Sequence, residues 1–193
     1  MTRHPEDHPR AVIPALDREL IDAVDLERFR PDVADSYAEY FWAEPGVEHY
    51  KLLAYLSTCW TDATLIDLGT DKGCSALALS HDRSNRVISY DIEDRKLSPI
   101  ILPNIEFRVK DALDDREDLL SAPLIMLDTA HDGVFERQIF DMLEESGYEG
   151  LLLLDDIYLN AAMRHFWSWI SLEKLDLTPI GHWSGTGLVR FTT

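Results

Sequence analysis

Short apolar runs alternate with amphipathic segments from residue 64 onward. The apolar runs predict five strands, at residues 64–67, 86–90, 105–109, 124–127 and 151–154. Apolar positions at helical spacing predict helices at residues 73–80, 114–120, 134–145 and 161–170. The run at 151–154 is apolar throughout, as expected of a strand buried on both faces. This alternation predicts an α/β fold in which a mostly parallel sheet has helices on both faces.

Two further strands are predicted at residues 175–182 and 187–191. The residues between them, Trp183-Ser184-Gly185-Thr186, are typical of a hairpin turn. The sheet is therefore expected to have seven strands and to end in an antiparallel β-hairpin. The segment 95–103, between the second and third strands, contains two prolines and is too short for a full crossover helix.

The first 63 residues precede the predicted sheet. Residues 1–14 contain three prolines and are expected to form a flexible leader. Residues 15–63 are expected to form a helical cap, because apolar residues recur at helical spacing from Leu16 to Val24 and again over residues 47–58. Aromatic residues are dense between residues 31 and 42. Two interpretations remain open for them: they line a substrate pocket, or they pack against the sheet or a second subunit of a homodimer.

Composition and charge narrow the classes of function. The 193 residues are enough for one domain with a single large core. With 36 acidic and 18 basic residues the net charge is −18, which disfavours nucleic acid and anionic membranes as main partners. No apolar run approaches the roughly 20 residues that a membrane span needs. The two cysteines form neither a disulfide framework nor a zinc site, so a reducing, cytoplasmic location is expected.

The first strand leads into a turn that is suited to binding a small ligand. Asp67 ends the strand, Gly69 and Gly73 form the turn, and a helix follows. Glycines allow close approach of the backbone, and the first N–H groups of the helix are unpaired donors. The spacing G-x-x-x-G differs from the G-x-G-x-x-G of dinucleotide folds. Asp67 and Asp71 would repel a diphosphate and attract a ligand with an amino group; the alternative is a turn whose glycines serve packing alone.

An acidic residue also ends the second predicted strand. Asp91 stands 18 residues after Gly73, where α/β nucleotide folds bind ribose. A carboxylate at this place accepts two hydrogen bonds from vicinal hydroxyls. The alternative is that Asp91 caps a helix.

These signals, in this order, resemble class I S-adenosylmethionine (SAM) dependent methyltransferases over residues 64–191. The similarity comprises the D-x-G-x-x-x-G turn, Asp91, the pair Asp111-Ala112 after the third strand, and the terminal hairpin. The resemblance implies a doubly wound, Rossmann-like sheet with SAM bound by Asp67, Gly69, Gly73, Asp91, Asp111 and Ala112. For Asp111 the alternative is a cap on the short helix that follows. Asp71 and Lys72 depart from the pattern, because many relatives carry a small residue there.

Acidic residues follow the fourth and fifth strands as well. Asp128, Asp155 and Asp156 resemble the magnesium ligands of metal-dependent O-methyltransferases of the catechol and macrocin type. The carboxyl ends of adjacent parallel strands lie close together, and three carboxylates there need a cation or raised pKa values. An oxygen-only site suits Mg²⁺ or Ca²⁺. The alternative is that Asp128 or Asp132 caps one helix and Asp155 or Asp156 caps the next.

His131 follows Asp128 by three residues and is a candidate general base together with it. Its alternatives are stacking on adenine and packing under a loop. The sequence therefore predicts a SAM-dependent methyltransferase that methylates a small hydroxylated molecule with the assistance of a metal. Two other hypotheses remain: a metal-independent methyltransferase, with Asp128 or His131 acting alone, and a non-catalytic SAM-fold protein that binds a partner. The glycine spacing and the hairpin disfavour a dehydrogenase.

Overall fold

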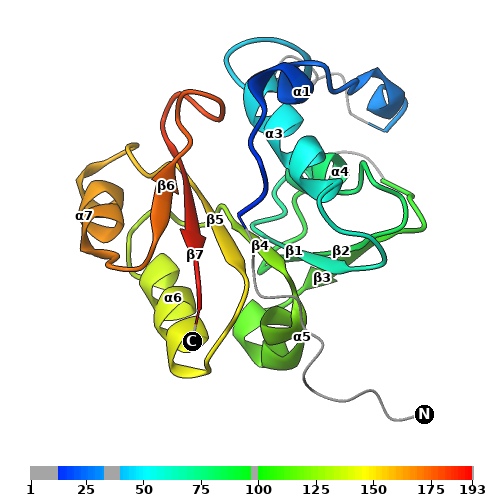
Figure 1. Ribbon diagram of the computed structural model, residues 1–193. Coiled ribbons are helices and arrows are strands. Elements are labelled where there is room, and N and C mark those ends of the chain that lie inside the picture. Colours follow the sequence, from blue (N-terminus) through cyan, green and yellow to red (C-terminus); the bar gives the residue numbers. More distant parts are fainter. Residues whose placement is uncertain (1–12, 33–39, 97–99, 193) are drawn as a thin grey trace.

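The computed structural model describes residues 13–32, 40–96 and 100–192. Its centre is a seven-stranded sheet in the order β3-β2-β1-β4-β5-β7-β6 (Figure 1). The strands are β1 (Thr64–Leu68), β2 (Arg86–Asp91), β3 (Ile105–Val109), β4 (Leu124–Leu127), β5 (Leu151–Asp155), β6 (Lys174–Asp176) and β7 (Thr186–Arg190). The first five strands are parallel to one another, and β7 is antiparallel to both β5 and β6. This confirms the predicted doubly wound sheet and its C-terminal antiparallel hairpin.

Helices cover both faces of the sheet. They are α1 (Arg18–Asp22), α3 (Val47–Ser57), α4 (Cys74–Leu79), α5 (Arg116–Ser121), α6 (Phe135–Glu145) and α7 (Ala161–Trp169), with the 3-10 turns η1 (Glu27–Phe29) and η2 (Ala112–Asp115). Figure 1 shows α1, α3 and α4 on one side and α5 and α6 on the other. None of the helices in the described segments is long and apolar enough to cross a membrane.

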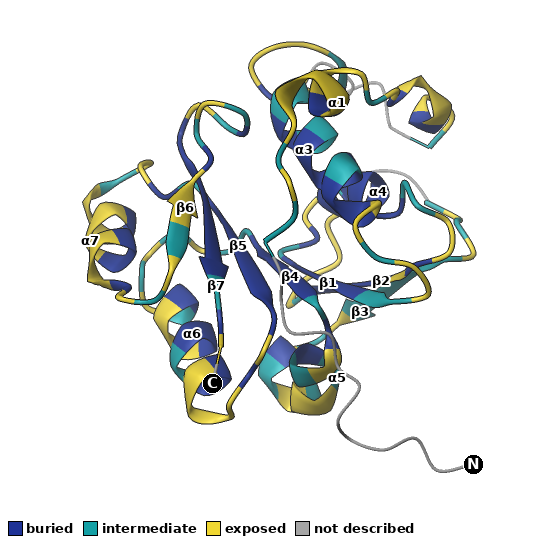
Figure 2. Cartoon of the chain, in the orientation of Figure 1, coloured by how far each residue is buried: buried dark blue, intermediate teal, exposed yellow. Residues whose placement is uncertain are grey.

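The alternation of side chains along each strand divides the apolar residues between two cores. Ile66 and Leu68 pack with α5, α6 and α7 in one core. Leu65 packs with α3 and α4 in the other, which also contains Phe41 and Phe29. Figure 2 shows the inner strands and β7 buried along most of their length, whereas β3 and β6 at the two edges of the sheet are partly exposed. Helix α4 is buried throughout, while α6 and α7 each have one buried and one exposed side. The helices expected to form the cap thus share a core with the sheet.

One predicted strand is too long, whereas one predicted helix is confirmed in two parts. The strand predicted at residues 175–182 ends at Asp176. The following residues form a tight turn, in which Leu177 O accepts hydrogen bonds from Ile180 N and Gly181 N, because Pro179 has no N–H to pair with a neighbouring strand. The helix predicted at 114–120 consists of η2 followed by α5. No helix occurs in residues 92–96 and 100–104, as expected for the short second connection.

The described residues include only part of the predicted leader and of the aromatic segment. The expected leader lies outside the described residues except for Ile13 and Pro14, and most of the aromatic segment also lies outside them. Phe41 from that segment is fully buried. Its ring stacks on Tyr50 of α3 with centroids 4.6 Å apart, and it meets Phe29 edge to face at 6.1 Å. For Phe41 the packing interpretation is therefore correct.

A buried asparagine ties the cap to the sheet, and its removal is expected to destabilise the fold. Asn85 is 1% exposed; its Oδ1 accepts from Ala63 N at 2.9 Å, and its Nδ2 donates to Ser57 O and Trp60 O at 2.7 and 3.0 Å. We expect Asn85→Ala to lower the free energy of unfolding by about 2 to 3 kcal/mol, because it leaves buried backbone groups unpaired. Urea denaturation measures this. The exposed neighbour variant Ser84→Ala is the control, and equal losses in the two variants would contradict the role of Asn85.

Candidate functional site

The turn after β1 brings three strand ends into contact. Gly69 has a φ of +103°, and a Cβ there would stand 1.6 Å from the carbonyl oxygen of Asp128. Only glycine fits this position without moving the end of β4 away from β1. The N–H groups of Gly69 and Thr70 donate to the carbonyl oxygen of Tyr90 in β2, at 2.9 and 3.1 Å. The turn therefore links the carboxyl ends of β1, β2 and β4.

A cavity of about 560 Å³ lies beside this turn. Its size is within the range of roughly 300 to 1,000 Å³ that is typical of small-molecule sites. Six of the residues predicted to bind cofactor or to act on the substrate line it: Gly69, Asp91, Asp111, Ala112, Asp128 and His131. The fold thus brings the residues after four different strands to one space.

Asp91 anchors the turn from the end of β2. Its Oδ2 accepts from Asp71 N at 2.9 Å, and its Oδ1 accepts from Glu93 N at 3.1 Å. Since no helix follows Asp91 within residues 92–96 and 100–104, the helix-cap alternative is wrong. Each carboxylate oxygen has a second acceptor position, so the side chain retains the capacity to bind a diol in the cavity.

Asp111 is both a cap and a cavity residue. Its Oδ1 accepts from Leu113 N at 2.9 Å, at the start of η2. The capping interpretation is therefore correct. The same side chain lines the cavity together with Ala112, so the cap does not remove it from the site.

The structure does not place Asp67 and Gly73 on the cavity wall. Asp67 is fully buried, and its Oδ2 accepts from Ser89 Oγ at 2.6 Å. A Cβ at Gly73 would stand 2.6 Å from the Ile100 side chain, so this glycine makes room for packing at the start of α4. The role of these two residues in cofactor binding stays a prediction.

Burial raises the pKa of the Asp67 carboxyl to about 7. The folded protein therefore holds a proton that the unfolded chain releases near its usual pKa of about 4. This contribution to stability is complete below about pH 4 and is lost as the pH rises through about 7.

We expect the wild-type free energy of unfolding to fall between about pH 4 and pH 8, by an amount on the order of a few kcal/mol. Asp67→Asn keeps the shape of the side chain but does not titrate, so its stability should vary less over this range. Urea denaturation of both proteins at several pH values measures the difference. Parallel pH profiles for the two proteins would show that Asp67 is ionised in the fold.

Asp128, Asp155 and Asp156 meet at the same edge of the sheet, and none of these three caps a helix. Asp132 accepts from the N–H groups of Val134 and Phe135 at the start of α6, at 2.8 and 3.2 Å. Asn160 caps α7. The capping alternative is therefore wrong for Asp128, Asp155 and Asp156, although it is correct for Asp132.

His131 lies between two of these carboxylates. Its Nε2 is 3.0 Å from Asp128 Oδ1 and 3.5 Å from Asp156 Oδ2. Burial lowers the pKa of His131, but the contact with Asp128 and the charge of Asp156 outweigh this and raise it to about 9. The imidazole is thus protonated at neutral pH in this arrangement, so His131 acts as a base only when another positive charge reaches the carboxylates or when the pH is high.

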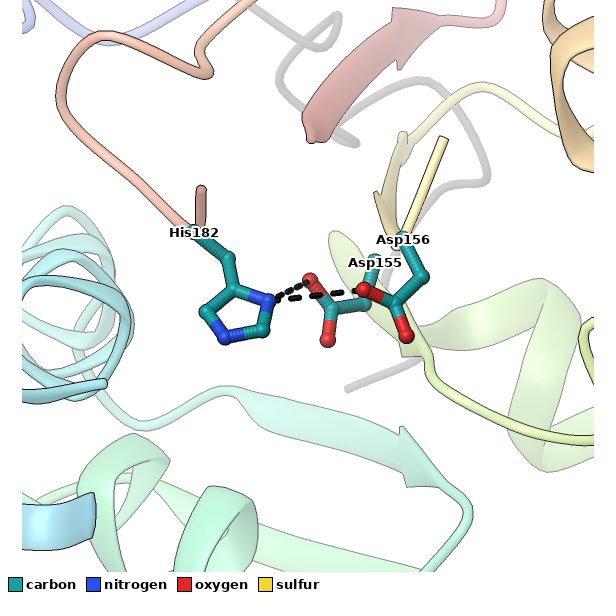
Figure 3. Close-up of side chains that lie close together, drawn as sticks. All are labelled: Asp155, Asp156 and His182. Carbon is teal, nitrogen blue, oxygen red and sulfur yellow. Dashed lines mark ion pairs between the residues drawn. The ribbon is translucent and has the colours of Figure 1, made fainter. Parts of the chain in front are cut away.

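Two further histidines join the acids, and the sequence did not reveal either. Figure 3 shows His182, from the loop between β6 and β7, pointing at both carboxylates after β5. Its Nδ1 is 3.4 Å from Asp156 Oδ1 and 3.8 Å from Asp155 Oδ1. His49 comes from α3, and its Nδ1 is 3.7 Å from Asp155 Oδ1. The cap and the hairpin therefore each supply one histidine to the same carboxylate.

The pKa values of the two carboxyl groups at the end of β5 are shifted in opposite directions. Burial, together with the charges of Asp128 and Asp156, raises the pKa of Asp155 well above its usual value. Burial also acts to raise the pKa of Asp156, but contacts with His182 and Ser184 outweigh it and lower the pKa. Asp155 is therefore the carboxylate that most needs a positive partner.

The residues present fit a divalent cation. Asp155 Oδ1 is buried and has no hydrogen-bond partner among the described residues. A cation would satisfy this oxygen and balance the neighbouring carboxylates. Among the described residues, however, the ligand atoms that lie within 4.8 Å of one another come from Asp155, Asp156 and His182, and not from the predicted set Asp128, Asp155 and Asp156.

Glu136, which the sequence analysis did not single out, fixes the loop that carries His131. It is 1% exposed; its Oε1 accepts from Thr129 Oγ1 and His131 N at 2.9 and 2.8 Å, and its Oε2 accepts from Gly133 N at 2.9 Å. The buried carboxylate holds the backbone of residues 129–133 at the edge of the cavity. The sequence does contain a sign of this role, because Glu136 lies on the same apolar face of the helix as Ile139, Phe140 and Leu143. A charged residue on such a face is expected to be buried and hydrogen-bonded.

Comparisons with known proteins identify the fold. No protein-family model and no curated protein matches the sequence. A SAH-bound methyltransferase of Podospora anserina, PaMTH1, is 14% identical, with a TM-score of 0.56 over 94% of this chain and 99% of that one. The O-methyltransferase TomG of Streptomyces achromogenes, in complex with SAM, is 15% identical, with a TM-score of 0.58 over 92% and 100%. A putative caffeoyl-CoA O-methyltransferase of Staphylococcus aureus is 10% identical, with a TM-score of 0.61 over 86% and 96%. The chain thus has the fold of class I SAM-dependent methyltransferases.

Proposed function

We propose that this protein is a SAM-dependent methyltransferase that transfers a methyl group to a hydroxyl oxygen of a small molecule. One observation carries the proposal: Asp128 and His131 line the same cavity as Asp91, the candidate ribose ligand. A methyl donor that is bound to Asp91 and a hydroxyl that faces His131 would share one enclosed space. Proximity of this kind is the main requirement for methyl transfer.

The charge of the cavity supports SAM as its ligand. Four aspartates line it, Asp71, Asp91, Asp111 and Asp128, against two basic residues, Arg95 and Lys110. SAM carries a positive sulfonium and an ammonium group, which these carboxylates attract, whereas a pyrophosphate would be repelled. SAM and SAH in the related structures described above are consistent with this choice.

The acid and histidine cluster supports a hydroxyl as the acceptor. A hydroxyl becomes an effective nucleophile when it loses its proton, and His131 Nε2 is a candidate acceptor for that proton. A divalent cation bound by Asp128, Asp155 and Asp156 would supply a Lewis acid that lowers the pKa of such a hydroxyl. Glu136 and Asn160 keep His131 at the cavity edge, since Asn160 Nδ2 donates to His131 O at 2.8 Å.

SAM binding tests the cofactor. We expect isothermal titration to show binding of SAM and SAH, and Asp91→Asn to weaken it by about tenfold or more, because a diol loses a charged acceptor. Asp94→Asn, at an exposed position nearby, is the matched control and should bind like the wild type. Failure of the wild type to bind either ligand at millimolar concentration would favour the non-catalytic alternative.

Methyl transfer tests the acceptor chemistry. With SAM and a panel of catechols and sugar diols, we expect His131→Gln to lower kcat by about a hundredfold or more, as for loss of a general base, without changing SAM affinity. His165→Gln, on the exposed side of α7, is the control. If EDTA leaves the wild-type rate unchanged, the metal-independent version is correct. An unaffected His131→Gln rate would remove His131 from the mechanism.

A further inference from the structure

A compact group of donor atoms lies beside the cavity. Asp155, Asp156 and His182 each offer one ligand atom, and these atoms all lie within 4.8 Å of one another. None of the three residues is among those that line the cavity, so they are not needed to enclose SAM. The group differs from the predicted set of acids, because a histidine from the β6–β7 loop takes the place of Asp128.

An unpartnered buried oxygen points into this group. The Asp155 side chain is only 8% exposed, and its Oδ1 accepts no hydrogen bond from the described residues. The same oxygen faces His182 Nδ1 at 3.8 Å and His49 Nδ1 at 3.7 Å. His49 Nδ1 is likewise buried without a hydrogen-bond partner in the described part of the chain. Buried polar atoms are nearly always paired, and a cation bound beside Asp155 Oδ1 would give this oxygen a partner.

The separations suit a small metal ion. Ligand atoms about 2.1 Å from a tetrahedral zinc stand roughly 3.4 Å apart. His182 Nδ1 stands 3.4 Å from Asp156 Oδ1 and 3.8 Å from Asp155 Oδ1. These atoms need only small shifts to close on one ion, and two carboxylates balance its charge. Asp128, in contrast, is engaged with His131 at 3.0 Å.

We propose that Asp155, Asp156 and His182 bind a first-row transition-metal dication of the zinc class in preference to Mg²⁺. An imidazole donor selects such ions, whereas Mg²⁺ prefers oxygen ligands and water. The proposal rests on the function proposed above and changes one part of it, because His182 takes the place of Asp128 among the ligands and the ion is of the zinc class. It does not require methyl transfer to be tested.

One neighbouring hydroxyl shares the donor atoms. Ser184 Oγ contacts Asp156 Oδ1 and stands 2.5 Å from His182 Nδ1. An ion bound at His182 Nδ1 replaces the hydroxyl at that nitrogen. Ser184→Ala is therefore expected to retain metal binding. If the contacts among Ser184, His182 and Asp156 were only structural, the same variant would lower the stability of the protein and the wild type would bind no metal there.

The test is isothermal titration of the full chain, freed of metal by a chelator, with Zn²⁺ and with Mg²⁺ in the absence of SAM. We expect one Zn²⁺ per chain, bound at least about tenfold more tightly than Mg²⁺. His182→Ala should weaken Zn²⁺ binding by about tenfold or more, Asp128→Asn by a smaller factor, and the exposed control His165→Ala not at all. Equal affinity for the two ions, or an unchanged His182→Ala, would overturn the proposal, and so would a larger loss in Asp128→Asn.

Circular dichroism shows whether each variant folds. If His182→Ala does not fold, X-ray absorption of the zinc-loaded wild type decides: imidazole scattering supports the site, and an oxygen-only shell overturns it. SAM titration of the same preparation separates the two proposals. Zn²⁺ binding without SAM binding contradicts the methyltransferase function alone, and SAM binding with no preference for Zn²⁺ contradicts only the metal site.

Discussion

The close contact between Gly69 and the Asp128 carbonyl is the constraint on which both halves of the site depend. Asp128 N donates to Leu68 O at 2.8 Å, so the β1–β4 pairing continues to the point where the two strands diverge. The missing Cβ at Gly69 lets the turn lie against the end of β4. The turn after β1 and the end of β4 are thereby neighbours, which explains why one cavity is lined by Gly69 and Asp71 of the turn and by Asp128 of the carboxylate cluster.

Electrostatics then determines how the cluster is arranged. Three carboxylates meet at one edge of the sheet in a chain of net charge −18, so the nearest counter-charges are histidines. His131 contacts Asp128 and Asp156, and His182 contacts Asp156 and Asp155. His49 does not supply a comparable positive charge to Asp155, because burial and the charge of His182 lower the pKa of His49 to about 4. Asp155 thus remains the poorly compensated member of the group, and it is also the most buried.

The sequence was sufficient to predict the strands and the acidic residues at their ends. It was not sufficient to predict the site residues that are brought in by packing between segments far apart in the chain. Apolar runs located the strands, and the acids that end them follow directly from that. His49 lies in the helical stripe of Leu52, Leu53 and Leu56, and Glu136 lies in a similar stripe of α6. A polar residue on an apolar helix face was therefore a usable signal for both. His182 stands in a turn that was taken for a strand, so its direction had no local signal. Asp67 is the penultimate residue of β1 and is fully buried; strand alternation alone does not show that it lies away from the cavity.

The position of β7 between β5 and β6 has a consequence for biosynthesis. The ribosome delivers β5 long before β7, so the edge of β5 stays open until the final strand enters antiparallel to it. His182 reaches the carboxylates of β5 on the loop that precedes β7. The turn after β1 can form on the nascent chain before β7 is made, whereas the histidine and carboxylate cluster is completed only after β7 has been made. The nascent chain therefore has the candidate cofactor turn before it has the full set of groups beside it.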